Sequence, residues 1–412
     1  MVTGVKRTVL VTDAGRGSAI AFIRSLGARG WRVIAADSTS RSAGFRSRYA
    51  AESFVYPAPA RSPRAFVDAL DALLRRRHVD LIVPVTDECI HPLSHARERF
   101  EGRTRLAIPS AWALATVTDK GATVDLANRL GVPVPATRIV TSPAEALCAA
   151  TELHYPVVVK PAVSCRYLPE ADRLERGHVS YARGPAELER LVHALEGRAV
   201  LLQEYVNGLG VGVECLARDG HVLLAFQHRR LAEIPPTGGA SAWRESVPLD
   251  PDLDRYARLL IGALDWTGLI MVEFKLGARP ALLEINGRVW GSLPLASLAG
   301  VDFPGELAEL LCPDGVAAVP AGGAYRVGVR AYNLELMLSW IAQVLIGRQR
   351  DRDLPRPGRA RALRGLLGLL DPSQKSDLSG GHDFAPRLGE VERIARKCFR
   401  KLAHPRPHGR SA

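Results

Sequence analysis

The side chains best suited to chemistry lie in one predicted β-hairpin: Glu273, Glu284, Asn286 and Arg288. Two apolar, β-prone runs flank a short turn at residues 277–280, of the kind that joins antiparallel strands. If the loop closes symmetrically, Leu276 pairs with Ala281 and Glu273 falls directly opposite Glu284. The amide and the guanidinium follow at two-residue steps, so the hairpin gathers all four side chains on one face.

Paired carboxylates of this kind indicate a cation site. Like charges directly opposite each other on a sheet repel, so a hard cation between Glu273 and Glu284 would explain the pair. Oxygen ligands suit Mg²⁺, which usually keeps several waters and takes further ligands from phosphates. Arg288 could hold a phosphate oxygen. We interpret this face as a site for a nucleotide with Mg²⁺ or Mn²⁺; the alternative is an ordinary glutamate pair on a solvated face.

Two lysines upstream are candidates for phosphate contacts. Lys160 ends an apolar strand that Pro161 then breaks, and Lys120 stands at a predicted helix start. A lysine on a buried strand requires a partner, which a phosphate would provide. The chain holds seven lysines against 48 arginines, which favours a functional reason for the lysines that remain. For Lys160 the alternative is a side chain that extends from the sheet edge into water.

A basic segment followed by a Gly/Ser loop is a second candidate site. Residues 226–231 read Phe-Gln-His-Arg-Arg-Leu, and two glycines and Ser241 lie in the loop at 235–245. We expect Arg230 to bind a substrate carboxylate and the acyl phosphate that it becomes. His228 is a candidate general base. The alternative is a solvated basic strand and a flexible loop.

The first part of the chain alternates strands and helices. Apolar runs at 8–12, 32–37 and 81–85 alternate with helical patterns, which predicts a parallel sheet covered by helices. The loop Gly15-x-Gly17 with Asp37 about twenty residues on is a partial dinucleotide fingerprint. Its third glycine is missing, so a plain strand-to-helix turn, or a substrate anion at the helix N-terminus, is the preferred interpretation.

Composition indicates a globular protein of two or three domains. The chain has 412 residues, 47% of them hydrophobic and 24% charged. No apolar run approaches the ~20 residues that span a bilayer, and the N-terminus does not resemble a signal peptide. The six cysteines show no C-x-x-C spacing, which is typical of reduced thiols. We therefore expect a cytoplasmic protein.

The net charge of +12 is concentrated at the C-terminal end. Residues 322–412 contain 18 Lys/Arg and 8 Asp/Glu, a balance of +10. The sequence is compatible with a solvated extension, or with docking to an acidic partner such as a carrier protein, an anionic membrane or a neighbouring subunit. No nucleic-acid partner is expected, because the segment has few aromatic residues to stack on bases.

Five motifs, in this order and at these spacings, resemble the ATP-grasp superfamily of carboxylate–amine ligases over roughly residues 8–312. They are Thr118-Asp-Lys120, Tyr155-Pro-Val-Val-Val-Lys160-Pro, Gln203-Glu-Tyr-Val206, Met271-Val-Glu273-Phe and Leu283-Glu284-Ile-Asn286-Gly-Arg288. The resemblance implies an ATP-grasp fold of α/β and α+β type. We expect an N-terminal parallel-sheet (pre-ATP-grasp) domain at 1–117, an ATP-grasp domain at 118–321 with a lid lobe at about 137–205, and a basic C-terminal helical extension at 322–412.

The resemblance also implies roles for individual residues. Lys120 and Lys160 would contact the phosphates of ATP, and Arg288 would steady the transferred phosphoryl group. Metal ligands would be Glu273, Glu284 and Asn286. The adenine would lie against Gln203, Glu204, Tyr205 and Val206, with Glu204 and Val206 contributing backbone groups.

Two positions depart from the family pattern. The family usually has an acidic ribose ligand where this chain has Gly210; Glu214, on the same strand face, is a candidate substitute. The loop after the second lysine is usually glycine-rich, whereas residues 162–177 contain several arginines. Either these arginines contact phosphate, or the loop orders only when nucleotide binds.

The activity implied is ATP- and Mg²⁺-dependent activation of a carboxylate as an acyl phosphate, followed by attack of an amine. The partners would then be a small carboxylate and a small amine, and a homodimer is a further option. The alternative is an ATP-binding regulatory or scaffolding protein with little turnover.

Overall fold

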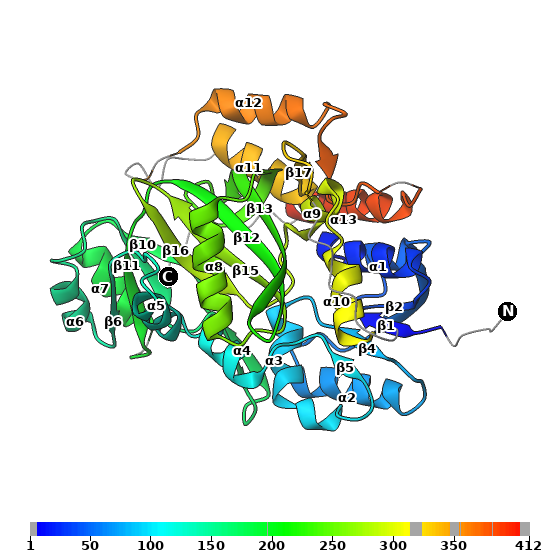
Figure 1. Ribbon diagram of the computed structural model, residues 1–412. Coiled ribbons are helices and arrows are strands. Elements are labelled where there is room, and N and C mark those ends of the chain that lie inside the picture. The colour runs from blue at the N-terminus through cyan, green and yellow to red at the C-terminus, as the bar shows by residue number, and fades with distance from the viewer. Residues whose placement is uncertain are drawn as a thin grey trace.

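A computed structural model describes residues 6–195, 197–313, 324–346, 354, 356–380 and 382–403 (Figure 1). The expected domain boundary at 321/322 lies outside these residues. A linker that its Arg, Pro and Asp content predicts at 347–364 lies partly outside them, and its last residues form the start of helix α12 (Arg359–Gly368) instead. Among the described residues, no helix combines the length and apolar character needed to cross a membrane.

The N-terminal domain is built on a five-stranded parallel sheet in the order β3-β2-β1-β4-β5. Its strands are β1 Thr8–Val11, β2 Arg32–Asp37, β3 Ala50–Val55, β4 Leu81–Val83 and β5 Arg105–Leu106. Its helices are α1 Gly17–Ala28, α2 Pro63–Leu74 and α3 Asp87–His95. The alternation of short apolar strands with helices therefore folds as a parallel sheet, which confirms that part of the predicted fold.

In the loop with the partial dinucleotide fingerprint, the polar groups bond to other residues of the protein. Asp37 Oδ2 accepts hydrogen bonds from the Gly15 amide at 2.8 Å and from Ser42 Oγ at 2.7 Å. A Cβ atom on Gly17, at the start of α1, would lie 3.0 Å from Cβ of Asp377. The carboxylate is thus engaged within its own loop and the helix start is covered by the C-terminal segment, which favours the interpretation as a structural turn.

A four-stranded antiparallel sheet forms the lid lobe, in the order β10-β7-β11-β6. Its strands are β6 Thr137–Val140, β7 Val157–Pro161, β10 Ser180–Ala182 and β11 Val200–Glu204. Helices α6 Pro143–Ala149 and α7 Pro185–His193 cover one face and share its apolar core. Two short helices, α4 Ala111–Thr118 and α5 Lys120–Arg129, lead into this lobe.

The segment after β7 is a β-hairpin, not a glycine-rich loop. Strands β8 Cys165–Leu168 and β9 Arg173–Arg176 pair antiparallel. At the tip, Asp172 Oδ1 accepts the amide of Arg64 at 2.8 Å, and its Oδ2 accepts Ser62 Oγ at 3.1 Å. The hairpin is therefore fastened to the start of α2.

A seven-stranded sheet, β16-β15-β12-β13-β14-β17-β18, forms the centre of the molecule (Figure 1). Its strands are β12 Leu209–Arg218, β13 His221–Ile234, β14 Ala240–Ser246, β15 Gly268–Leu276, β16 Pro280–Asn286, β17 Arg330–Tyr332 and β18 Lys375–Ser376. Helix α8 Pro251–Ala263 packs on one face. Apolar residues of the other face share a core with α9 Leu293–Ala299, α10 Phe303–Leu311 and the N-terminal domain.

The described C-terminal residues do not form a detached basic extension, which corrects our expectation for 322–412. Strand β17 pairs with β14 of the central sheet, and β18 pairs with β17. Helices α11 Leu334–Leu345 and α12 Arg359–Gly368 form an apolar cluster with residues of β13 and β14, and α13 is Ala385–Ala403. Asp377 forms a buried ion pair with Arg244 of β14. A solvated segment was one of the two alternatives that the net charge left open, and the apolar residues between the charges instead pack on the central sheet.

Candidate active site

The hairpin of β15 and β16 places Glu273 opposite Glu284. At the turn, Leu276 pairs with Pro280 and not with Ala281, so the symmetric closure that we expected is wrong by one residue. A bulge at Leu283 inserts one unpaired residue and restores the pairing of the two glutamates. The carboxylate pair was therefore predicted correctly, although by a turn geometry that the chain does not adopt.

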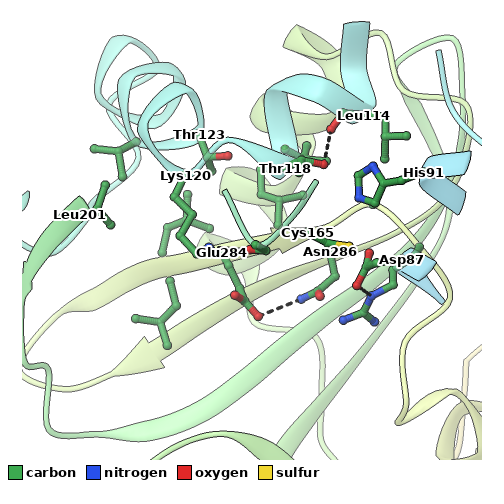
Figure 2. A pocket seen from close by; sticks show the side chains of 18 of the residues that line it. Asp87, His91, Leu114, Thr118, Lys120, Thr123, Cys165, Leu201, Glu284 and Asn286 are labelled. Atoms are coloured by element: carbon green, nitrogen blue, oxygen red, sulfur yellow. Dashed lines mark hydrogen bonds and ion pairs between the residues drawn. The ribbon is translucent and has the colours of Figure 1, made fainter. Parts of the chain in front are cut away.

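The two carboxylates meet at the amide of Asn286. Its Nδ2 donates to Glu273 Oε1 at 3.0 Å. It also donates to Glu284 Oε1 at 3.3 Å, as Figure 2 shows. Burial raises the pKa of Glu273, and the Glu284 charge adds to this, against the opposing effect of Arg230. The described residues contain no group of three or more His, Cys, Asp or Glu side chains placed to hold a metal. Two carboxylates and an amide instead suit Mg²⁺ that shares its remaining positions with water and phosphate.

Arg230 belongs to a chain of ion pairs behind these carboxylates. Its Nη2 lies 2.5 Å from Glu273 Oε1, and its Nη1 lies 3.2 Å from Glu233 Oε1 and donates to the Gly239 carbonyl at 2.9 Å. Lys275 Nζ completes the chain at 3.0 Å from Glu233 Oε2. Arg230, with 9% of its surface exposed, is thus positioned to hold Glu273, and its contact with a substrate carboxylate stays a prediction.

Lys120 and Lys160 are buried cations with neutral hydrogen-bond acceptors. Lys120 Nζ donates to Ser164 Oγ at 2.5 Å and to the Pro161 carbonyl at 3.2 Å. Lys160 Nζ donates to Gln203 Oε1 at 2.8 Å. Burial lowers both pKa values, that of Lys120 to about 8. In the part of the chain that the structure describes, neither ammonium forms an ion pair, so each lacks the anionic partner that a buried charge favours.

Arg288 joins the site to the N-terminal domain. Its Nε donates to Asp87 Oδ2 at 2.8 Å. Burial opposes ionisation of both groups, but their mutual attraction outweighs it, raising the pKa of Arg288 and lowering that of Asp87. Sequence reasoning missed Asp87, which lies just after β4. Its position was a usable signal, because ligands bind at the carboxyl ends of parallel strands.

These residues surround a cavity of about 150 Å³ between the N-terminal domain, the lid and the central sheet. Figure 2 shows Lys120 reaching from its helix toward Glu284. Of the predicted site residues, the cavity is lined by Lys120, Gln203, Glu284, Asn286 and Arg288, while Lys160 and Glu273 contact lining residues. Thr118, the first residue of the Thr118-Asp-Lys120 motif, also lines the cavity. Polar or ionisable lining residues that the sequence did not indicate are Asp87, His91, Thr123, Ser164 and Cys165.

Comparison with known proteins agrees with this arrangement. Residues 196–330 match the family model described as ATP-grasp in the biosynthetic pathway with Ter operon. The large chain of carbamoyl phosphate synthase from Thermomicrobium roseum is 29% identical over 275 residues, which cover 61% of this chain and 24% of that relative. These matches support the assignment of the chain to the ATP-grasp superfamily. The chain spans about a quarter of the length of the curated relatives that it matches.

Solved structures show the same ATP-grasp fold. Biotin carboxylase from Campylobacter jejuni superposes with a TM-score of 0.62 at 18% identity, over 79% of this chain and 74% of that one. An ADP complex of N5-carboxyaminoimidazole ribonucleotide synthetase gives a TM-score of 0.60 at 14% identity, over 90% of this chain and 98% of that one. At these identities the likeness establishes the fold alone.

The segment predicted to meet adenine, residues 203–206, spans the end of β11 in the lid. Glu204 pairs with Ala136 through backbone and side chain, and its amide donates to the Ala136 carbonyl at 2.9 Å. Tyr205 donates its hydroxyl to the Thr237 carbonyl at 3.4 Å and packs edge-on against Tyr181. Val206 is half-buried. The segment thus connects the lid to the loop after β13.

Glu214 does not reach the cavity of the ATP-grasp site. Its side chain is fully buried, accepts a hydrogen bond from Ser292 Oγ at 2.7 Å and lies 3.0 Å from His228 Nδ1. His228 is equally buried, so this structure does not present it as a general base. A different carboxylate lies over Gly210: a Cβ atom there would be 3.0 Å from Glu233 Oε1. Glu233 occupies the space into which the usual acidic side chain would project.

Proposed function

We propose that the protein is an ATP- and Mg²⁺-dependent ligase that activates a small carboxylate as an acyl phosphate for attack by an amine. One observation carries the proposal. Two buried lysines that lack an anionic partner lie on one side of a cavity, and two opposed carboxylates lie on the other side. Polyphosphate and a divalent cation together would satisfy both sets of charges. Most of the chain superposes on the ATP-grasp fold, which supports this assignment.

The chain's own residues fit such ligands. Lys120 and Lys160 would hold phosphate oxygens, and residues 203–206 would meet the adenine. Glu233, in place of an acid at position 210, would bind the ribose hydroxyls. Glu273, Glu284 and Asn286 would hold the metal, which when bound supplies charge neutralisation on the phosphates.

The reaction then has two steps. A carboxylate oxygen attacks the terminal phosphorus of ATP, the bond to the bridging oxygen breaks, and ADP leaves. The amine nitrogen next attacks the acyl carbon, phosphate departs with the bonding electron pair, and the amine loses a proton. Arg288 would stabilise negative charge on the transferred phosphoryl group, and the Asp87 carboxylate would fix the position of that guanidinium.

Nucleotide binding requires the lid to move. The cavity of about 150 Å³ is smaller than the ~300–1,000 Å³ of typical ligand pockets. The hairpin of β8 and β9, which carries Cys165 at the cavity wall, closes it from the lid side. We infer an opening of the lid for entry and a closed state during catalysis, which would protect an acyl phosphate from water.

A screen for ADP release over pooled carboxylic acids and amines tests the proposal. Glu284→Gln should lower ADP release by at least about 100-fold, because it removes a charged metal ligand without changing shape. Glu152→Gln, at a half-exposed carboxylate of the lid, is the matched control and should retain the wild-type rate. Chelation of Mg²⁺ should abolish release, and Mn²⁺ should restore it.

A silent screen with a wild-type protein that still binds ATP would favour the regulatory alternative. The structure offers no observation that favours that alternative, since the metal and phosphate side chains are all present.

A further inference from the structure

Helix α12 presents its leucines to the outside of the molecule. Leu363, Leu366, Leu367 and Leu370 are 50%, 44%, 66% and 82% exposed. Their spacing of three, one and three residues places them in one stripe along the helix and the residues that follow it. Surface helices of globular proteins normally turn such a stripe toward the core.

The opposite face of α12 carries almost no side-chain atoms. Its buried residues are Ala362, Gly365 and Gly368. A Cβ atom on Gly365 would lie 2.7 Å from the terminal methyl of Met337 and 3.1 Å from the ring of Trp340, both in α11. Small residues therefore let α12 rest directly on α11, and this packing forces the leucines outward. The exposed stripe is a consequence of specific packing and not of a loosely attached helix.

The stripe lies in a wholly basic stretch of sequence. Between Asp353 and Asp371 the chain has four arginines and no acidic residue. Arg359, Arg361 and Arg364 are exposed. Arg361 donates to the Leu231 carbonyl at 2.7 Å, whereas no carboxylate among the described residues pairs with Arg359 or Arg364. The surface thus combines a convex apolar ridge with uncompensated positive charge.

We propose that α12 is a docking element for an anionic lipid surface. An amphipathic helix with leucines on one side and arginines beside them is suited to lie in the plane of a membrane interface. Figure 1 shows α12 as the outermost element above α11, so a flat surface can reach it without displacing any other element that the structure describes. A second copy of the chain fits less well, because two such ridges would bring together like charges with no carboxylate between them. This inference does not depend on the proposed ligase activity.

Co-sedimentation of the full-length protein with vesicles tests the proposal. We expect binding to phosphatidylcholine vesicles that contain phosphatidylglycerol, little binding to phosphatidylcholine alone, and a steep loss of binding as salt rises. Leu367→Gln/Leu370→Gln should weaken binding by at least about tenfold by removing inserted apolar surface. Arg359→Gln/Arg364→Gln should weaken it by a similar factor and reduce its salt dependence.

Leu259→Gln, at a leucine of α8 that is 39% exposed, is the control and should bind like the wild type. Thermal unfolding should be unchanged in all three variants, since the replaced side chains are exposed. A wild-type protein that does not bind the anionic vesicles would overturn the proposal. A second result would also overturn the proposal: the wild type is a dimer, and Leu367→Gln/Leu370→Gln makes it a monomer without changing vesicle binding. The leucine stripe of α12 would then be the contact between two copies of the chain.

Discussion

At the scale of residues, the site is defined by charges that the protein does not neutralise by itself. The ammonium groups of Lys120 and Lys160 are buried against hydroxyl, carbonyl and amide oxygens. Burial without a counter-ion favours the neutral amine, and this is why both pKa values are lowered. A phosphate group would restore the charged form, so nucleotide binding and protonation are coupled.

This coupling predicts a pH dependence of nucleotide affinity. Lys120, with a pKa of about 8, is mostly charged below pH 8 and mostly neutral above it. ADP affinity should therefore change little below about pH 7 and fall above pH 8, by up to about tenfold per pH unit. Calorimetric titration of ADP without Mg²⁺ across this range measures the effect. In Lys120→Arg, which stays charged, the fall should be reduced; an equal fall in both proteins would exclude Lys120 as its origin.

The position of Glu233 predicts recognition of the ribose. Glu233→Gln should weaken ADP binding about tenfold, because hydrogen bonds from hydroxyls to a charged acceptor are stronger than to an amide. One of the two deoxy nucleotides, 2′-deoxy-ADP or 3′-deoxy-ADP, lacks the hydroxyl that Glu233 contacts. The same substitution should have little effect on the affinity for that nucleotide. Calorimetry on the six combinations of two proteins and three nucleotides isolates the interaction. Equal weakening for ADP and for both deoxy nucleotides would show that Glu233 acts only through its ion pairs with Arg230 and Lys275.

At the scale of elements, two hairpins determine the geometry of the site. The bulge in β16 aligns Glu284 with Glu273 and keeps the neighbouring Leu282 and Ile285 in the apolar core. The hairpin of β8 and β9 fastens the lid to the N-terminal domain through Asp172, which itself adopts a positive φ of 44°. The first hairpin is held by core packing. The second contacts the N-terminal domain through polar groups at its tip, the Arg176–Glu88 ion pair and the edge-on packing of Tyr167 against His95. Because these contacts are fewer and more polar, the second hairpin is the element that we expect to move.

Asp172→Gly should release this contact without straining the backbone, because glycine accepts the positive φ. Amide hydrogen exchange of residues 165–176 should become faster, and ADP should associate several-fold faster if lid opening limits entry. Asp219→Gly is the matched control, since Asp219 also has a positive φ of 47° and lies in a turn remote from the lid. Unchanged exchange in the hairpin of Asp172→Gly would show that other contacts hold it closed.

At the scale of the whole molecule, the C-terminal segment connects the central sheet to the N-terminal domain. Asp377 pairs with Arg244 inside the sheet, and Asp383 accepts hydrogen bonds from Arg24 and from the amide of Arg48. Removing the chain after Gly347 would leave Arg244 buried without its counter-ion. Such a truncation is therefore expected to destabilise the fold, and cannot serve to isolate a tail function.

The buried side chain of Glu390 makes stability depend on pH. Burial, and next the charge of Asp377, raise its pKa from 4.5 to about 7. The folded state thus binds a proton that the unfolded state has released, so stability falls as pH rises from about 4.5 to 7 and stays lower above. Glu390→Gln should be more stable than the wild type by about 3 kcal/mol at pH 8, with no difference near pH 4. Urea unfolding at both pH values checks this.

Glu392→Gln is the control, because the exposed Glu392 pairs with Arg46 and its pKa is lowered. It should bring no stabilisation at pH 8. A gain equal to that of Glu390→Gln would point to the general reduction of negative charge on α13.

The sequence by itself determined those features that depend on residues close together along the chain. The facing of Glu273 and Glu284 follows from strand alternation within one hairpin, and the parallel N-terminal sheet follows from the spacing of its apolar runs. Lys120 and Lys160 were found because each stands at the end or start of a recognisable element. Their grouping followed from the ATP-grasp resemblance, which the fold confirms.

Only the tertiary structure decided which distant residues meet. The Asp87–Arg288 pair joins positions 201 residues apart, and Glu233 lies over Gly210 because a neighbouring strand brings it there. Local spacing suggested Glu214 instead, which the fold buries beside His228. The packing of the C-terminal segment was also decided by the tertiary structure. Its net charge is a sum over residues and can be read from the sequence. Its packing depends on which apolar faces contact one another, and these contacts form only when the whole chain folds.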